Sequence, residues 1–380
     1  MKLKVLIGML ILTIALVHCN KNKNFGNDIS SKTITIDETK TANVRFVLKA
    51  SVETDFVACP RLAVSPYQNK VILYGLSSAK NEKSDLVAHT YDKLLKFLNR
   101  KTFMHGQGPG DVGNNNIISI GKDQLMISEN SNQRVSIYDN DWNYKTSFRH
   151  KFEIDAFEAY EDGKCFISAD SLDNGKKEEI SFFTGSIYDF KIRRFFKTDF
   201  SFRNLEKKGI RKYILGGGTN YSWFYRNNRI FILDCAKYRL LKFDARGKQL
   251  KDITVKMKKK KTDQSLIDEY SRDQGIYNYR KTFIFNDTVD PTAAMIPLSK
   301  GFVVIRRQDY SSNCNGMSDG DYFTDNLEYV GKVKIPCFFE LLMLGFASRK
   351  NESVKFDNGF LYLVQERDDK TMIEKWQVLE

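Results

Sequence analysis

The chain has 380 residues, of which 42% are hydrophobic, so it is long and apolar enough to bury a sizeable core. It contains only 6 prolines, which argues against a disordered linker protein. Its formal net charge of +13 would favour an anionic partner or surface. Because the lysines are scattered among asparagines, we expect a generally basic surface and no nucleic-acid partner.

The first residues predict export from the cytoplasm. Lys2 and Lys4 precede a mostly apolar stretch, residues 5–17. This stretch is too short to span a bilayer as a helix, but it suits the core of a secretory signal. An ordinary secretory signal and an uncleaved anchor are both compatible with that pattern.

The sequence L-V-H-C at residues 16–19, followed by the polar run N-K-N-K-N, resembles a bacterial lipoprotein signal. The resemblance implies cleavage after residue 18, a signal peptide over residues 1–18, and lipid attached to Cys19. Several fatty chains together anchor a protein stably in a membrane. His18 departs from the small residue usual at that position, and Asn20 points to the outer membrane by the enterobacterial sorting rule. Residues 19–31 then form a polar tether.

A polar turn followed by an apolar, β-rich run recurs six times along the chain, and a further short apolar strand precedes each run. The stretch from residue 117 to residue 148 holds four such strands separated by turns, which is one propeller blade. Stacked blades share a core that one blade cannot form alone. The sequence therefore predicts an all-β fold, a six-bladed β-propeller of four-stranded antiparallel blades. The equivalent apolar positions are Val71, Leu125, Cys165, Ile230, Phe302 and Phe360.

Two of these units align without gaps. I-S-E-N-S-N-Q-R-V-S-I-Y-D from Ile127 matches I-L-D-C-A-K-Y-R-L-L-K-F-D from Ile232. The pattern N-x-R-V-x-I-Y-D resembles the NHL repeat. The loop G-Q-G-P-G-D at residues 106–111 resembles the G-x-G-P-G-E/D loop of bacterial six-bladed β-propeller proteins, many of which are lipoproteins. The resemblance extends over residues 60–380 and implies the same fold.

The ring is expected to close between the two ends of the chain. The last unit, from Ser353 to Val378, supplies only three clear strands, whereas the segment from Thr33 to Ala50 contains strands without a blade of their own. We therefore predict that this segment joins the last blade, which also protects a sheet edge. The propeller domain then covers residues 32–380.

Three loops are longer than a blade needs. Residues 201–218 end in three glycines but lack the G-K-[ST] of a phosphate-binding loop, so an interblade turn is favoured. Residues 256–281 hold a lysine run and a short predicted helix, from about Thr262 to Arg272, in what we interpret as a solvated loop. In the third, residues 310–322, Asp319 and Asp321 flank a glycine, a weak calcium pattern without the D-x-D-x-D-G spacing.

The cysteines show no C-x-x-C spacing, so we expect no zinc site. Cys165 and Cys235 lie in or beside apolar strands, where a buried thiol behaves as a small hydrophobic residue. A disulfide between Cys314 and Cys337 is compatible with an oxidising periplasm.

Ligand contacts are predicted at loops and strand ends near the mouth of the central channel, where loops from all blades converge. The glycine loop and its histidine could instead be structural, and aromatic rings on an innermost strand could instead pack between blades. The predicted ligand-binding residues are aromatic, cationic or amide side chains: His105, Gln107, Tyr221, Trp223, Tyr225, Arg226 and Arg306.

These observations predict a lipid-anchored protein of the bacterial envelope whose propeller binds or scaffolds a protein, peptide or glycan. The alternative is a lactonase-like hydrolase, a propeller enzyme with a metal in its channel. The innermost strands offer Asn116, Asp155, Glu158 and Asn220 as metal ligands, but no obvious convergent set. We therefore assign no catalytic residue, metal or cofactor. We expect the N-terminal lipid to make the contact with the membrane.

Overall fold

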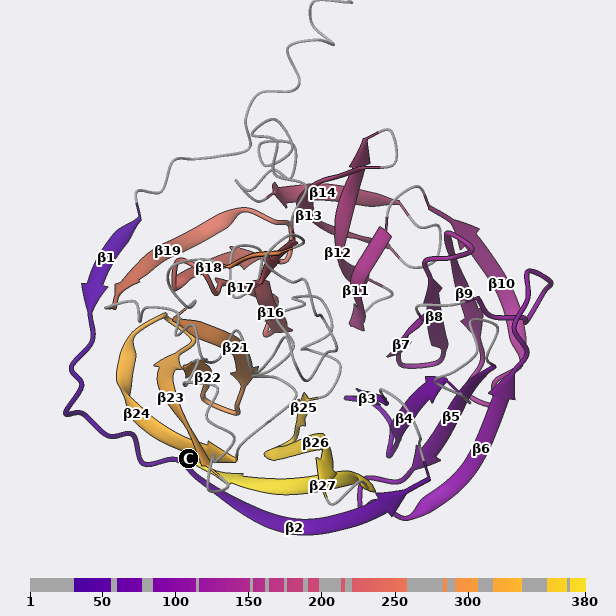
Figure 1. Ribbon diagram of the computed structural model, residues 1–380, viewed down its shortest axis with the longest axis horizontal. Helices are drawn as coiled ribbons and strands as arrows, with labels where there is room; N and C mark the ends of the chain where they lie inside the picture. Colours follow the sequence, from indigo (N-terminus) through magenta and orange to yellow (C-terminus); the bar gives the residue numbers. More distant parts are fainter. Residues whose placement is uncertain are drawn as a thin grey trace, which may run out of the picture.

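The structure, a computed structural model, shows six four-stranded blades arranged in a ring, one of which gains a fifth strand from the N-terminal segment (Figure 1). The described residues are 31–55, 60–76, 85–113, 116–150, 153–160, 164–173, 176–186, 191–197, 213–215, 221–257, 283–285, 291–306, 317–336, 354–367 and 370–380. All regular structure within these ranges is β-strand. The all-β, six-bladed prediction is confirmed.

Each blade runs from an innermost first strand to an outermost fourth strand. Blades 1 to 3 are β3 (Arg61–Val64), β4 (Val71–Leu76), β5 (Leu86–Tyr91) and β6 (Phe97–Phe103); β7 (Asn116–Ile120), β8 (Leu125–Glu129), β9 (Arg134–Tyr138) and β10 (Tyr144–Arg149); and β11 (Glu153–Tyr160), β12 (Lys164–Asp173), β13 (Lys176–Ser186) and β14 (Ile192–Lys197).

Blades 4 and 5 are also built from consecutive strands, whereas blade 6 combines strands from both ends of the chain. Blades 4 to 6 are β16 (Tyr221–Arg226), β17 (Arg229–Asp234), β18 (Arg239–Asp244) and β19 (Gln249–Lys256); β21 (Thr292–Pro297), β22 (Gly301–Arg306), β23 (Met317–Thr324) and β24 (Tyr329–Pro336); and β25 (Val354–Asp357), β26 (Phe360–Arg367), β27 (Lys370–Leu379) and β2 (Arg45–Thr54). Two short strands, β15 (Tyr213–Leu215) and β20 (Phe283–Phe285), pair outside the blades.

The apolar runs recognised in the sequence are the second strands of the six blades. Val71, Leu125, Cys165, Ile230 and Phe302 are fully buried there, as is expected for a strand covered on both faces. Cys235, just after β17, is also buried, and both it and Cys165 are free thiols. Burial raises the pKa of the Cys165 thiol to about 12, so the thiol is protonated and acts as a small apolar group.

The core of the molecule lies between the blades. Six clusters of buried apolar side chains are present among the described residues, and each draws on two neighbouring blades. We call each such contact a seam. One pair from each seam, in ring order, is Phe103 and Tyr138, Met126 and Phe157, Phe166 and Trp223, Phe231 and Phe302, Val303 and Leu361, and Tyr362 and Tyr91.

In four blades the turn before the fourth strand is stabilised in the same way, by a side-chain oxygen that accepts hydrogen bonds from two backbone N–H groups of the turn. In blade 1 the carboxylate of Asp92 accepts hydrogen bonds from the backbone N–H groups of Leu94 (2.8 Å) and Lys96 (2.9 Å). Leu95 between them has a φ of 66° and a buried side chain, so burial offsets the cost of a left-handed residue. The capping residues of the other three turns are Asp139, Asp244 and Thr324, and the left-handed residues are Trp142, Gly247 and Leu327.

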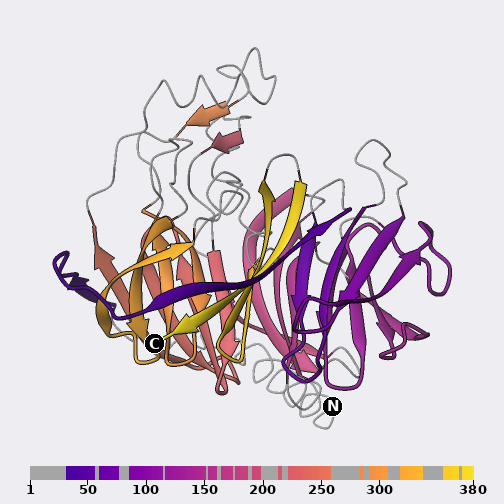
Figure 2. The same ribbon diagram turned by 90° about the horizontal axis from the view of Figure 1, so that it is seen from below.

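The N-terminal segment, residues 31–54, forms a belt around the outside of three blades (Figures 1 and 2). β1 (Lys32–Thr35) runs parallel to β19 of blade 4. Across blade 5, the N–H of Ala42 donates to the carbonyl of Lys332 (2.7 Å), and the N–H of Lys332 donates to the carbonyl of Lys40 (2.8 Å). β2 then pairs antiparallel with β27 along its whole length and completes blade 6.

The belt confirms one half of the predicted ring closure and corrects the other. The strand V-R-F-V-L does join the last blade, as part of β2. The strand T-I-T-I does not: it lies on blade 4, where Ile34 and Ile36 pack into the seam between blades 4 and 5. Blade 6 lacks only one strand, and β2 is long enough to fill that place alone.

The third long loop is also shorter than predicted. Strand β23 begins at Met317, so Asp319 and Asp321 lie on a strand and not in a loop. Gly320 is in the ladder opposite Ile305 and Val333. The signal peptide, Cys19, the three glycines of residues 216–218, the helix near Thr262 and the cysteine pair 314 and 337 lie outside the described residues.

Removing the belt, residues 31–54, should lower the melting temperature sharply, because it exposes the edge of β27 and uncovers seams at blades 4 to 6. Gly331→Val provides a milder perturbation. A β-carbon at Gly331 would lie 2.7 Å from the backbone of Thr41 and Ala42, so this change should detach the belt from blade 5 alone. It should cost about 1–3 kcal/mol. Thermal unfolding followed by circular dichroism measures both, and a belt-free chain that melts like the intact protein would contradict the closure.

Candidate functional site

The seven predicted ligand residues fall in three separate places. His105 and Gln107 lie in the connection between blades 1 and 2. Tyr221, Trp223, Tyr225 and Arg226 all lie on β16, the innermost strand of blade 4. Arg306 ends β22 in blade 5. The residues therefore do not converge on one site, and each place has its own construction.

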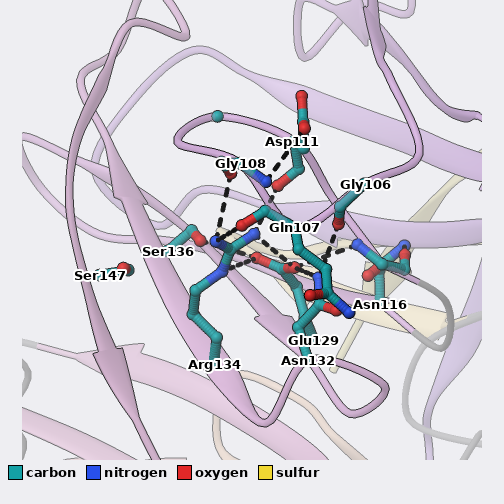
Figure 3. Close-up of polar contacts among 12 residues, drawn as sticks. Gly106, Gln107, Gly108, Asp111, Asn116, Glu129, Asn132, Arg134, Ser136 and Ser147 are labelled. Atoms are coloured by element: carbon teal, nitrogen blue, oxygen red, sulfur yellow. Dashed lines mark hydrogen bonds and ion pairs between the residues drawn. The ribbon is translucent and has the colours of Figure 1, made fainter.

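The glycine-proline loop is held by a buried ion pair (Figure 3). Arg134, at the start of β9, donates through Nε and Nη2 to the two carboxylate oxygens of Glu129 at the end of β8 (3.1 and 3.0 Å). The guanidinium also donates hydrogen bonds to the loop. Nη2 donates to the carbonyl of Asp111 (2.6 Å), and Nη1 donates to the carbonyls of Gln107 and Gly108 (both 3.2 Å). We call Glu129 and Arg134 the loop clamp.

Glu129 has no exposed surface, and its oxygens are surrounded by donors. Besides Arg134, they accept hydrogen bonds from the Gly113 N–H (3.0 Å), the Asn132 amide (2.8 Å) and the Ser136 hydroxyl (2.7 Å). Burial alone would lower the pKa of Arg134, but the hydrogen bonds and charge of Glu129 outweigh it and raise that pKa. A charge so fully satisfied stabilises the loop and offers nothing to a ligand.

Further hydrogen bonds and close contacts within the glycine-proline loop fix its backbone. The Asp111 carboxylate accepts a hydrogen bond from the Gly108 N–H (3.1 Å), and a β-carbon at Gly106 would come within 2.4 Å of that carboxylate. The N–H of His105 donates to Asp85 (3.0 Å). The side chain of Gln107 stays exposed. The loop is therefore structural in its backbone, while its outer side chains remain open to contacts.

Tyr221, Trp223 and Tyr225 on β16 face blade 3, whereas Phe224 between them faces blade 5. Trp223 is buried, with its ring centroid 4.0 Å from that of Phe166. Tyr221 and Tyr225 pack against the same seam and are only partly exposed. The hydroxyl of Tyr221 donates to the carboxylate of Asp234 (3.3 Å). This contact lies at the end of β16 that receives the chain from blade 3, and we call such strand ends, where one blade is joined to the next, connection ends. Of the three rings, Trp223 is thus committed to blade packing, and Tyr221 lies nearest the face on which blades are joined.

Arg306 lies at the connection end of the seam between blades 4 and 5. Its Nε and Nη2 donate to the buried carboxylate of Asp321 (2.8 and 2.6 Å), which also accepts the hydroxyl of Tyr238 from blade 4 (2.7 Å). Its Nη1 donates to both oxygens of Glu38 in the belt (3.1 and 2.9 Å). Burial opposes the charge on Arg306, but these carboxylates raise its pKa. The cluster joins two blades and the belt.

The partners of Arg306 were not recognised in the sequence. Asp321 was interpreted as a weak calcium ligand, yet it is buried against Arg306 and Tyr238, and Asp319 pairs with Lys334 (2.7 Å). The only signal in the sequence was the alternation of Asp319, Gly320 and Asp321, which fits a strand with both carboxylates on one face.

Arg226 lies at the other end of the same seam, on the opposite side of the ring. Turns on that side join the first strand of a blade to the second and the third to the fourth, and we call it the hairpin face. It forms an ion pair with Asp325 in the turn before β24, and its guanidinium lies 5.4 Å from the ring of Phe224. Burial lowers the pKa of Arg226 to about 10, although Glu380 and Tyr322 oppose the shift. It remains charged at neutral pH. Arg226 and Arg306 therefore stabilise opposite ends of one seam.

The face on which blades are joined carries the longest connections of the chain. Between β14 and β16 there are 23 residues, and between β19 and β21 there are 35, compared with 3 between β10 and β11. β15 in the first and β20 in the second form a parallel ladder, with Tyr213 opposite Phe283 and Leu215 opposite Phe285. Figure 2 shows this ladder standing off the ring on that side, opposite the C-terminus. We call this side the connection face.

Metal ligands do not gather in the described part of the chain, where no three His, Cys, Asp or Glu side chains lie close enough to hold an ion. The amide of Asn116 donates to the carbonyl of Gly113 (2.7 Å). The side chain of Asp155 and the whole of Asn220 lie outside the described residues. Nor do the described ranges contain a helix long and apolar enough to cross a membrane.

The fold is shared with solved structures that have little sequence in common with this chain. A member of the DUF4221 family from Bacteroides vulgatus is 10% identical, with a TM-score of 0.52 over 90% of this chain and 100% of the other. A predicted exported protein from Bacteroides fragilis is 11% identical, with a TM-score of 0.51 over 92% and 99%. No known family profile matches the chain, and no curated protein sequence matches it.

These likenesses establish the class of fold. The chain is a six-bladed β-propeller, similar in architecture to these two Bacteroides proteins. A regucalcin from Agrobacterium tumefaciens is also similar, at 8% identity and a TM-score of 0.43 over 92% of this chain and 97% of the other, which is too low to support a shared activity.

Arg134→Ala should lower the free energy of unfolding by about 3–5 kcal/mol, because it leaves the carboxylate of Glu129 buried without its main partner. Lys334→Ala, which removes the exposed ion pair with Asp319, is the control and should cost less than about 1 kcal/mol. Urea unfolding measures both. Equal costs for the two variants would show that the loop clamp is not a buried structural charge pair.

Proposed function

We propose that this protein is a binding or scaffolding module of the bacterial cell envelope, which holds a protein, peptide or glycan partner at the connection face. The observation that carries the proposal is the ladder between β15 and β20. Three residues are enough to join blades 2 and 3, so the connections that contain this ladder are far longer than ring closure requires. Connections of that length in a compact domain usually serve binding.

Four of the predicted ligand residues suit this face. Tyr221 and Arg306 lie at strand ends that open onto it, and His105 and Gln107 belong to an interblade connection. In the proposal His105, Gln107 and Tyr221 contact the partner, with Gln107 and Tyr221 offering an exposed amide and a partly exposed ring. Arg306 supports the face from below, since its guanidinium is held by Asp321 and Glu38. Trp223 and Tyr225 support blade packing behind them.

The proposed location is the envelope, with the chain anchored by lipid on Cys19. The belt begins at Ser31, so the segment 19–30 would be a tether of at most about 40 Å if fully extended. Such a tether keeps the ring close to the membrane while leaving it free to turn. The likeness to a predicted exported protein supports an exported location. The lactonase-like alternative gains no specific support among the residues that the structure describes.

A photo-crosslinking residue tests which face holds the partner. The full chain, made in its native host, carries benzoylphenylalanine at Lys237, in the β17–β18 turn of the connection face. The control position is Asp123, in the β7–β8 turn of the hairpin face. Because benzophenone reacts with C–H bonds of any chemistry, we expect discrete protein or glycan adducts from Lys237 and few from Asp123. Ile214→Pro with Ile284→Pro, which breaks the ladder, should abolish them.

The outcomes separate location from binding. Cys19→Ser should move the chain from the membrane fraction to the soluble fraction without changing the melting temperature. Adducts of equal yield from Lys237 and Asp123, or adducts that survive loss of the ladder, would contradict binding at the connection face. A Cys19→Ser chain that stays in the membrane would contradict the lipid anchor alone.

A further inference from the structure

The outer strands of blades 6 and 1 carry an unusual concentration of exposed apolar side chains. Eight large hydrophobic side chains are exposed among the described residues, and six of them lie on β2, on β6 or in the residues next to β6. The most exposed are Leu94 (74%) and Met104 (71%), followed by Phe97 (52%) and Leu98 (48%). Val47 and Leu48 are the two on β2.

The two strands are neighbours on the rim of the ring (Figure 1). Asp55, directly after β2, lies 3.4 Å from His89 on β5 and 3.9 Å from Arg100 on β6. The outer edge of β6 pairs with no other strand in the described residues. We give the name blade 6–1 rim to the surface from Lys93 to Met104 around β6, together with the exposed stretch from Arg45 to Lys49 on β2. The stretch on β2 lies farther back along the strand, roughly 20 Å or more from the contact at Asp55.

The apolar side chains of the rim are interleaved with cations. Lys93, Lys96, Arg100 and Lys101 lie in the β6 part, and no aspartate or glutamate occurs from residue 93 to residue 110. Lys96 and Arg100 are exposed. On β2, Arg45 and Lys49 are exposed beside Val47 and Leu48. Two of these cations lie beside carboxylates from other strands, Lys93 at 2.6 Å from Asp357 and Arg100 at 3.9 Å from Asp55. The exposed side chains of the rim are therefore mainly apolar or cationic, with a local excess of positive charge.

This composition fits one partner best. The centre of a protein–protein interface is depleted of lysine, whereas a membrane-surface site combines apolar groups that insert among lipid chains with lysine and arginine that attract anionic headgroups. An outer strand is also a convex edge, which suits a broad surface more than a small ligand. The charge and the exposed apolar area point in the same direction.

We propose that the blade 6–1 rim docks on an anionic phospholipid surface, so that the ring stands edge-on to the membrane. The inference goes beyond the proposed function, because it concerns the surface of the propeller and depends neither on the lipid at Cys19 nor on a partner at the connection face. Edge-on docking leaves the connection face accessible from the side.

Hydrogen–deuterium exchange of the full chain tests the proposal, because it reports where the propeller touches the bilayer however the N-terminus is attached. The chain is mixed with phosphatidylcholine vesicles, or with vesicles in which about a third of the lipid is phosphatidylglycerol. Peptides covering residues 93–104 and 45–50 should exchange about tenfold more slowly on the anionic vesicles than on the neutral ones. About 1 M sodium chloride, which shortens the Debye length to about 3 Å, should remove the difference.

Matched variants assign the effect to the rim. Leu94→Ser, Lys96→Glu and Arg100→Glu together should abolish the protection. The control combines Arg246→Glu, Lys248→Glu and Leu250→Ser in and after the equivalent turn of blade 4, where the same residue types are exposed. It should leave rim protection unchanged. Because all six positions are at the surface, melting temperatures should stay close to that of the parent chain.

Three results would overturn the proposal. One is equal exchange at the rim on anionic and neutral vesicles. Another is rim protection that appears only when an envelope protein extract is added, which would assign the rim to a protein partner. The third combines two observations: the parent chain keeps its contact with anionic vesicles at high salt, and the rim variant aggregates. Together they would mean that the cations serve only to block edge-to-edge pairing.

Discussion

The whole ring depends on the contact between the two ends of the chain. A propeller blade has two apolar faces and buries them only against its neighbours, so a row of six blades stays open unless the first and last are joined. Here β2 supplies the fourth strand of blade 6 by pairing with β27 from Arg45 to Thr54. Since the chain continues from β2 directly into blade 1, the same strand draws blades 6 and 1 together and completes the last seam.

The belt extends this closure beyond one strand. It adds β1 to blade 4, crosses blade 5 at Thr41 and Ala42, and only then becomes β2. Glu38 of the belt meets Arg306 at the seam of blades 4 and 5, so closure is coupled to an ion-pair cluster that also contains Asp321 and Tyr238. The longest insertion, between β19 and β21, thus lies between two blades that the belt covers.

The sequence predicted the architecture well because its signal is periodic. Each second strand contains a short apolar run after a polar turn, and the β9 and β18 units align residue for residue, so six blades could be counted. The polar clusters could not be predicted, because they join residues far apart in the chain. Nothing near Arg306 in the sequence indicates Glu38, and the residues around Asp321 suggest only a weak calcium pattern. An overlooked signal is the aromatic residue before a capping Asp or Thr, at Tyr91–Asp92 and Phe323–Thr324, which marks the fourth-strand turns.

The internal ion pairs also explain why residue type alone was a weak guide to the site. Arg226 and Arg306 look like ligand-binding cations in the sequence, yet each is paired within or between blades, as Arg134 is. What the ring leaves open is elsewhere: a connection face with two paired insertions, and a rim with apolar and basic side chains. The proposed function and the proposed membrane contact use these two surfaces, which do not compete.

The most direct test of the closure is a disulfide across it. Glu53 and Met372 are opposite each other on β2 and β27, so Glu53→Cys with Met372→Cys places two thiols across the closing pair of strands. If the ring opens there first, the oxidised form should unfold in denaturant at least about tenfold more slowly than the reduced form of the same variant. Equal unfolding rates for the two forms, with the disulfide confirmed, would mean that the ring opens elsewhere and that β2 is not what holds it closed.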